Sequence, residues 1–162
     1  MDAEGGGLVE RQDVETLAQL TYELANPMGV LWSQRRSVIR DGWLDVARRR
    51  LSEVEAVDMR EPAGSGKVPD HNHGLAVARS SAVLGAFKAH GQGHRPLSLH
   101  TLIRETGLDP AVLVRTVRLL VIRGVLVEIS APMDPSGQAA FRLLGPGFAL
   151  LADGSSGPRS RP

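Results

Sequence analysis

Apolar residues recur at helical spacing along the first part of the chain. Between residues 13 and 25, one face of a helix would carry Val14, Leu17, Ala18, Thr21, Leu24 and Ala25. Asn26 and Pro27 are typical of an N-cap followed by the first residue of a new helix. The next apolar residues at helical spacing are Met28, Leu31, Trp32, Val38 and Ile39. The pattern therefore predicts two helices that are separated at Asn26.

The segment "RDGW" at 40–43 is expected to end the second of these helices. A third helix is predicted over about 43–57, where one stripe carries Leu44, Ala47, Leu51 and Val54. Two or three amphipathic helices are too few to make a substantial core alone. The helical segment 13–57 is therefore expected to pack on the later part of the chain or on a second copy of itself, and to drive dimerisation.

Three segments lack such a pattern. Residues 1–12 are expected to be a flexible N-terminus. Residues 58–73 are rich in proline, glycine and charge, which predicts a linker. The polar residues 153–162 are expected to form a disordered tail.

Residues 74–152 carry closely spaced signals for helix starts and stops. "GLAVARSSAVLGAFKAH" predicts a helix that turns Leu75, Ala78, Ala82, Val83, Ala86 and Phe87 inward. Ser98 can cap a short helix over 99–105, and Gly107 can end it in the left-handed conformation. Asp109 and Pro110 predict the start of another helix, which runs to Arg123 and stops at Gly124.

The rest of this region reads as a hairpin. Residues 125–130 and 139–144 have strand propensity, and the turn-rich segment 131–138 lies between them. "GPGFALLAD" then predicts a short helix. The predicted fold class is mainly α: a winged helix-turn-helix domain over 74–152, with three helices and a two-stranded wing, preceded by the amphipathic helices.

Composition and the distribution of charge give two further expectations, one on the cellular compartment and one on the partner. With 42% hydrophobic and 23% charged residues, the 162-residue chain can bury a core. It has no cysteine, signal peptide or long apolar run, so we expect a cytoplasmic protein without a membrane partner. Residues 1–60 hold 8 arginines against 11 acidic residues, whereas 74–152 has a small basic excess. The second part is the better candidate for meeting a polyanion.

The segments "RPLSLHTLIRETGLDPAVLVRTVRLLVIRGVLVE" and "FRLLGPGFALLA" resemble the DNA-binding domain of IclR-type bacterial transcription regulators. The matching features are "PLSL", "ETGLD", Arg115, "LLxxxGVL" and "FRLxGPG". The resemblance covers about residues 75–152 and implies a winged helix that binds duplex DNA. The same stretch is also similar to the winged-helix dimerisation domain of small-molecule O-methyltransferases, through "DPAVLVRTVRLLVIRGVLVE".

The predicted DNA-reading helix spans about 110–123. At 100° per residue, its core face would carry Leu113, Val117, Leu120 and Val121, while Ala111, Arg115, Arg118 and Ile122 lie opposite. Docked in a major groove, the helix would present its outer residues to bases or phosphates, and Leu119 and Ile122 would lie under the hairpin. The candidate DNA-binding residues are Ser98, Leu99, Arg104, Ala111, Val112, Val114, Arg115, Arg118, Gln138 and Arg142.

The apolar content of that outer face leaves a second hypothesis open. An apolar face with two arginines also suits a protein partner, so the same fold could serve dimerisation or docking without DNA. The two histidine pairs, His71 with His73 and His90 with His94, lack cysteine or carboxylates at metal-binding spacing. No nucleophile–base pair or carboxylate pair stands out. We therefore expect no enzyme activity, no metal and no cofactor.

Overall fold

A computed structural model describes residues 5–59, 71–91, 94–129 and 139–153, and their side chains over 10–58, 75–91, 94–129 and 139–150. This part of the chain is mainly helical with a small antiparallel sheet of three strands. None of its helices is long and apolar enough to cross a membrane. The helices are α1 (Gly5–Ala25), α2 (Ser37–Met59), α3 (His71–Ala89), α4 (Leu99–Thr106), α5 (Pro110–Ile122) and α6 (Gly145–Asp153). The strands are β1 (Leu97–Ser98), β2 (Leu126–Ile129) and β3 (Ala140–Leu143).

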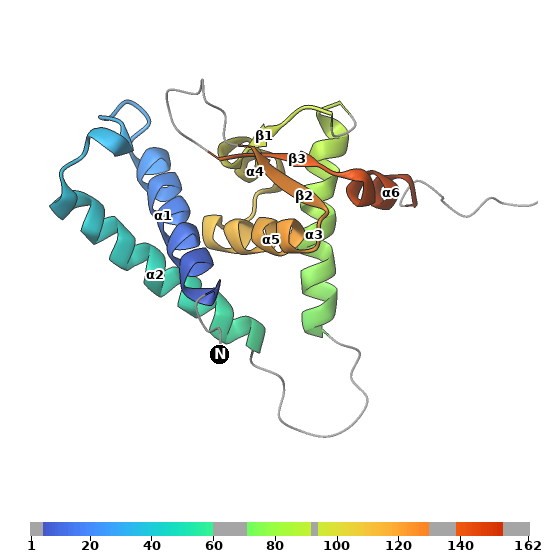
Figure 1. Cartoon of the computed structure of the whole chain (residues 1–162), viewed down its shortest axis with the longest axis horizontal. Coiled ribbons are helices and arrows are strands. Elements are labelled where there is room, and N and C mark those ends of the chain that lie inside the picture. Colours follow the sequence, from blue (N-terminus) through green and yellow to red (C-terminus); the bar gives the residue numbers. More distant parts are fainter. Residues whose placement is uncertain (1–4, 60–70, 92–93, 130–138, 154–162) are drawn as a thin grey trace, which may run out of the picture.

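Helices α1 and α2 lie side by side as a helical pair on one side of the molecule (Figure 1). The predicted helix start at Asn26 is wrong. The amide side chain of Asn26 donates to the carbonyl of Tyr22 at 2.9 Å, and the Gly29 amide donates to the Asn26 carbonyl at 2.9 Å. These bonds close a turn, and only a short 3-10 helix, Trp32–Gln34, follows before α2.

The predicted break at 40–43 is also wrong, because α2 continues from Ser37 to Met59. A glycine inside a helix costs about 1 kcal/mol relative to alanine, which packing can offset. Here the residues after Gly42 supply that packing: Ala47 is buried, and Trp43 packs edge-on against Tyr22 with ring centroids 5.8 Å apart. Trp32 also contacts Tyr22, so both tryptophans serve packing.

Three boundaries differ from the predicted segments. Helix α1 begins at Gly5, inside the segment predicted to be flexible. Helices α2 and α3 extend into the two ends of the predicted linker, and its middle, 60–70, lies outside the described residues. The predicted tail lies outside them as well, apart from the last residue of α6.

The C-terminal part follows the predicted order of helices and hairpin. Strands β2 and β3 pair antiparallel with Leu126 opposite Leu143, and α6 follows where a short helix was expected. Strand β1 was not expected. It has two residues, and it pairs with β3 through Leu97 opposite Phe141, which gives the strand order β1-β3-β2.

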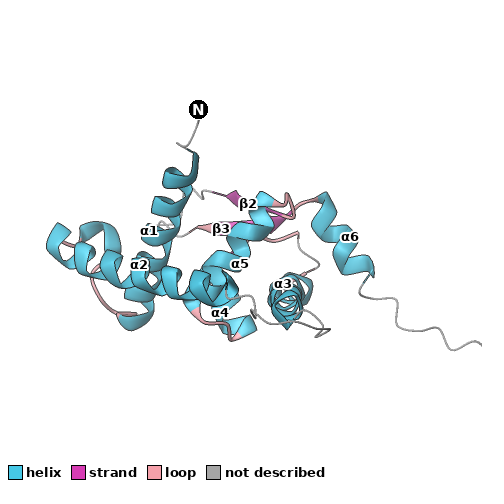
Figure 2. Ribbon diagram, turned by 90° about the horizontal axis from the view of Figure 1, so that it is seen from below, coloured by secondary structure: helices cyan, strands magenta, loops and turns pink. Residues whose placement is uncertain are grey.

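Helix α5 is the central element of the fold. It contacts α1, α2, α3, α4 and β2. Both views show it between the α1–α2 pair and α3 (Figures 1 and 2). The buried side chains form one cluster that runs from Leu17 of α1 through Leu113 of α5 to Phe87 of α3. The N-terminal helices therefore share a core with the later part of the chain, which is one of the two arrangements expected from the sequence.

Candidate nucleic-acid interface

The turn between α4 and α5 is set by three local signals, all as predicted. Gly107 ends α4 with φ of 66°, in the left-handed region that favours glycine. The carboxylate of Asp109 accepts from the amide of Ala111 at 2.9 Å and caps α5, whose first residue is Pro110. Gly124 follows α5 with φ of 68°. These residues fix where α5 begins and ends, and therefore which of its side chains can point outward.

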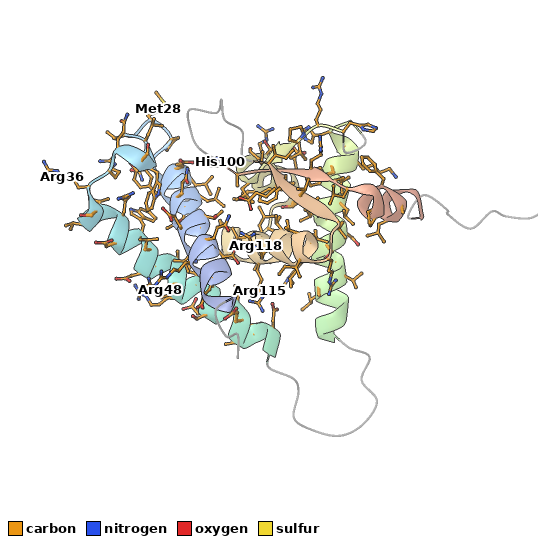
Figure 3. All side chains as sticks on the ribbon, in the orientation of Figure 1. Met28, Arg36, Arg48, His100, Arg115 and Arg118 are labelled. Atoms are coloured by element: carbon orange, nitrogen blue, oxygen red, sulfur yellow. The ribbon has the colours of Figure 1, made fainter. Side chains whose placement is uncertain are left out.

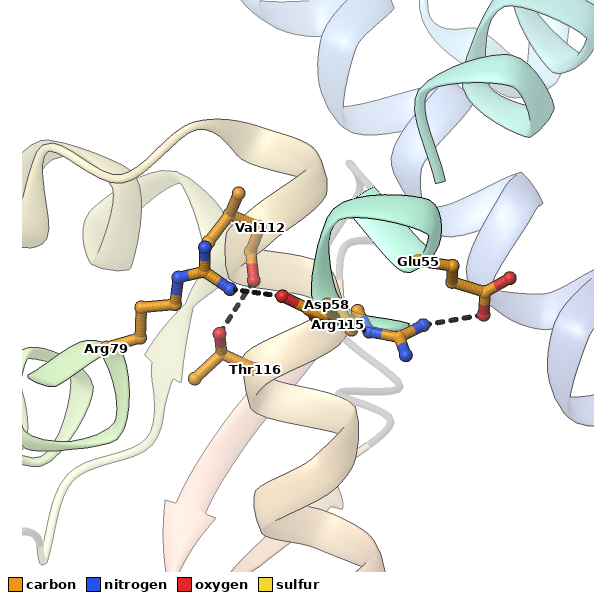
Figure 4. A network of polar contacts seen from close by, with 6 residues as sticks. All are labelled: Glu55, Asp58, Arg79, Val112, Arg115 and Thr116. Atoms are coloured by element: carbon orange, nitrogen blue, oxygen red, sulfur yellow. Dashed lines mark hydrogen bonds and ion pairs between the residues drawn. The ribbon is translucent and has the colours of Figure 1, made fainter. Parts of the chain in front are cut away.

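Arg115 projects from the side of α5 that faces α2 (Figure 3). Its Nη1 lies 2.6 Å from Oε1 of Glu55, and its Nε lies 3.1 Å from Oδ2 of Asp58. Asp58 also accepts from Nη1 of Arg79 at 3.0 Å, so this one carboxylate joins α2 to both α5 and α3 (Figure 4). The Arg115 side chain keeps 25% of its surface exposed.

Arg118 is held in the same way by α1. Its Nε lies 2.6 Å from Oδ1 of Asp13, and its Nη1 lies 3.5 Å from Oε2 of Glu128. The side chain is 17% exposed. The two candidate arginines on α5 are therefore paired with carboxylates of the same chain, and most of these carboxylates belong to α1 and α2.

The Asp13 carboxyl has a raised pKa. Burial penalises its charged form and outweighs the hydrogen bond and the charge of Arg118, which act in the opposite direction. The ordinary pKa of the group is 3.8. The buried ion pair thus holds a carboxylate whose ionisation costs free energy in the folded state.

This shift predicts a pH dependence of stability. The folded chain binds a proton at Asp13 more readily than the unfolded chain, so the contribution of Asp13 to the unfolding free energy falls as pH rises above 3.8. Above the raised pKa it stays constant. Urea unfolding between about pH 3.5 and about pH 7 should show wild type losing stability relative to Asp13→Asn. If wild type instead gains relative to the variant, the Arg118 ion pair outweighs burial.

The apolar candidates on α5 do not form an open face. Ala111 and Val114 are buried and Val112 is half-buried, contrary to the predicted outer face. Val114 and Leu99 line a small cavity together with Asp13 and Thr16 of α1, which shows that α1 lies directly over them. Helical periodicity placed Ala111 opposite the first core face and Val112 and Val114 on its flanks, whereas α1 provides a second core face at Val114.

The remaining described candidates lie on α4, on β3 and at the start of α4. Ser98 is half-buried, and its hydroxyl accepts from the amide of Thr101 at 3.3 Å, as an N-cap does. Arg104 is exposed and lies 3.5 Å from the Glu105 carboxylate. Arg142 is exposed on β3. Gln138 lies outside the described residues.

Leu119 and Ile122 do not lie under the hairpin. Their exposed fractions are 41% and 68%, and both line a cleft between α5 and the α1–α2 pair. The expectation that the hairpin covers them is wrong: β2 contacts α5, but both side chains line the cleft on the side of the α1–α2 pair.

The histidines have ordinary contacts where their side chains are described. Nε2 of His90 lies 3.3 Å from Oε1 of Glu105, and the ring of His94 lies 5.1 Å from that of Phe148. The side chains of His71 and His73 are outside the described set. Within the described residues, no three histidine, cysteine or acidic side chains gather as a metal site would require.

Comparison with known proteins finds no matching protein family, no curated relative and no similar solved structure. The functional proposal therefore rests on the geometry of the chain itself.

Proposed function

We propose that the chain is a DNA-binding transcription regulator of the winged helix-turn-helix type, similar to the IclR group. Helices α3, α4 and α5 supply the three helices, and β2 and β3 supply the wing. The observation that carries the proposal is the pairing of Arg115 and Arg118 with four carboxylates. These two arginines lie on the part of α5 that would contact DNA if α5 is the recognition helix. The carboxylates pair with them as DNA phosphates would.

In the arrangement seen here, α1 and α2 cover the recognition helix. DNA binding therefore requires the N-terminal helix pair to move off α5, and only the fraction of molecules with α5 free can bind. A covered form and a free form are the two states that a regulator needs. Arg104, Arg142 and the N-terminus of α4 are already exposed or half-exposed and would contact the DNA backbone.

The N-terminal helices also support a homodimer. Met28, Val30, Leu31, Val38, Ile39 and Val46 are apolar and exposed, and all belong to α2 or to the turn before it. This surface lies away from α5, so two copies could pair through it while each keeps its covered recognition helix. Such a dimer would read two half-sites about one helical turn apart.

A second candidate function is favoured by the packing of α1 and α2 over α5. Protein already occupies the outer face of α5, as in a winged helix that serves protein contacts alone. In that case the chain is an interaction module, similar to the methyltransferase dimerisation domain, and its arginines only tie α5 to α1 and α2.

Binding to duplex DNA separates the two candidates. Fluorescence titration with labelled genomic fragments should show wild-type binding that weakens steeply between about 50 and about 200 mM salt. The double variant Arg115→Gln/Arg118→Gln should bind at least about tenfold more weakly, because each well-placed arginine–base contact contributes about 1–3 kcal/mol.

Arg36→Gln/Arg49→Gln is the matched control, since it removes the same charge from exposed positions in α2 and just before it. If wild type shows no salt-dependent binding, or if the two double variants bind alike, the recognition helix does not read DNA and the interaction module is the better account.

A further inference from the structure

A cleft of about 510 Å³ lies where α1, α2 and α5 meet. Its apolar walls come from all three helices: Val14 from α1, Leu51 from α2, and Leu119 and Ile122 from α5. Pockets of about 300–1,000 Å³ with mainly apolar walls and a few polar groups are typical of small-molecule sites. The cleft therefore has the size of a ligand site, with apolar side chains set among charged ones from all three helices.

Two apolar residues in the wall of the cleft are not covered by other apolar side chains. Leu119 is 41% exposed and Ile122 is 68% exposed, although the other apolar side chains of α5 are buried or half-buried. Both line the open cleft. An apolar ligand body that covers them would remove their surface from water, which is the main source of affinity for such a ligand.

The charged residues of the cleft favour one anionic group. Arg115 and Arg118 are already neutralised by Glu55 and Asp13. Arg48 is not fixed in this way, because its partner Asp45 lies three residues earlier on the same helix and both side chains are largely exposed. Such a pair contributes little, so Arg48 can exchange Asp45 for a ligand carboxylate. Glu10, on the α1 wall, limits the negative charge that the cleft accepts.

We propose that this cleft binds a small organic acid: an aliphatic or aromatic body with a single carboxylate. The Arg48 guanidinium holds the carboxylate, and Leu119 and Ile122 hold the body. Because the contacts come from α1, α2 and α5 together, the ligand binds only while the helix pair covers α5. By linkage it stabilises the covered form. Resting on the proposed function, this makes the organic acid an inhibitor of DNA binding.

The direct test uses three probes with one body and different head groups: 4-phenylbutyrate, 4-phenylbutanol and 4-phenylbutylamine. Each is titrated into the full-length chain, and methyl resonances are followed by NMR. We expect saturable shifts at Val14, Leu51, Leu119 and Ile122 and none at Val38 or Leu75. The butyrate should bind at least fivefold more tightly than the other two probes. Equal or tighter binding of the amine, or shifts spread over every exposed apolar residue, would overturn the site.

Two variants assign the parts of the site. Arg48→Gln should weaken the butyrate to the level of the alcohol and leave the alcohol unchanged. Ile122→Ser should weaken all three probes, whereas Val38→Ser, at an exposed apolar position outside the cleft, should weaken none. Unchanged butyrate binding by Arg48→Gln contradicts the role of that residue.

The proposed inhibition of DNA binding is measured in a separate experiment. Saturating 4-phenylbutyrate should lower the DNA affinity of wild type at least fivefold and leave that of Arg48→Gln unchanged. An unaltered DNA affinity with the cleft occupied contradicts the inhibition. The NMR titrations contain no DNA. A failure to bind the probes therefore contradicts the cleft proposal and leaves the proposed DNA binding to its own test.

Discussion

Neutralising Glu55 and Asp58 together is expected to raise the affinity of the chain for duplex DNA by about three- to tenfold. The double variant Glu55→Gln/Asp58→Asn keeps the shape of both side chains and removes the ion pairs that hold Arg115, together with the pair between Asp58 and Arg79. Partly exposed pairs contribute about 0.2–1 kcal/mol each. Their loss enlarges the fraction of molecules in which α5 is free, and the apparent affinity rises by the same factor.

A control variant must separate this release from a simple change in charge. Asp41→Asn/Glu53→Gln also removes two negative charges from α2, at exposed positions away from α5. Its DNA affinity, measured in the same titration, should rise less than twofold. If both double variants gain equally, the effect is general electrostatics, and if neither gains, these ion pairs do not restrain α5.

Leu17→Ala should lower the unfolding free energy by about 2–5 kcal/mol, the usual cost of removing a large side chain from a well-packed core. Leu17 lies on α1 with no exposed surface, in the same cluster as Leu113 and Phe87. Leu24→Ala is the matched control, because Leu24 lies on the same helix and is 42% exposed. It should cost less than about 1 kcal/mol.

Urea unfolding followed by circular dichroism measures both variants. A single transition that moves with Leu17→Ala would show that the N-terminal helix pair unfolds with the rest of the chain. Two transitions, of which only one responds to Leu17→Ala, would contradict a shared core. In that case the helix pair would leave α5 at a lower cost in free energy than a shared core requires.

The parts of the fold that the sequence predicts correctly are those with local causes. Gly107, Asp109, Pro110 and Gly124 act through their own backbone conformations and through hydrogen bonds to near neighbours. The same local reasoning fails at Gly42. There the packing of the following turns on α1, which is remote in sequence, keeps α2 helical through a residue that otherwise favours a break.

The candidate site shows the same limit. Periodicity identifies Leu113 and Val117 as core residues, but it cannot say that Ala111 and Val114 are buried as well, with Val114 beside α1. Three of the four carboxylates that hold the arginines lie 57, 60 and 105 residues away along the chain. The acidic excess of residues 1–60 was the one available hint of a partner for the basic part, and it could not assign any pair.

Ser98 is both the last residue of β1 and the N-cap of α4. No residue separates the sheet from α4 at this point, so β1 joins β3 directly to the first turn of α4. Under the proposed function, the gap between Arg142 and the α4 N-terminus would therefore be set within the protein before any DNA binds. A change in groove width would have to be met by the nucleic acid rather than by the protein.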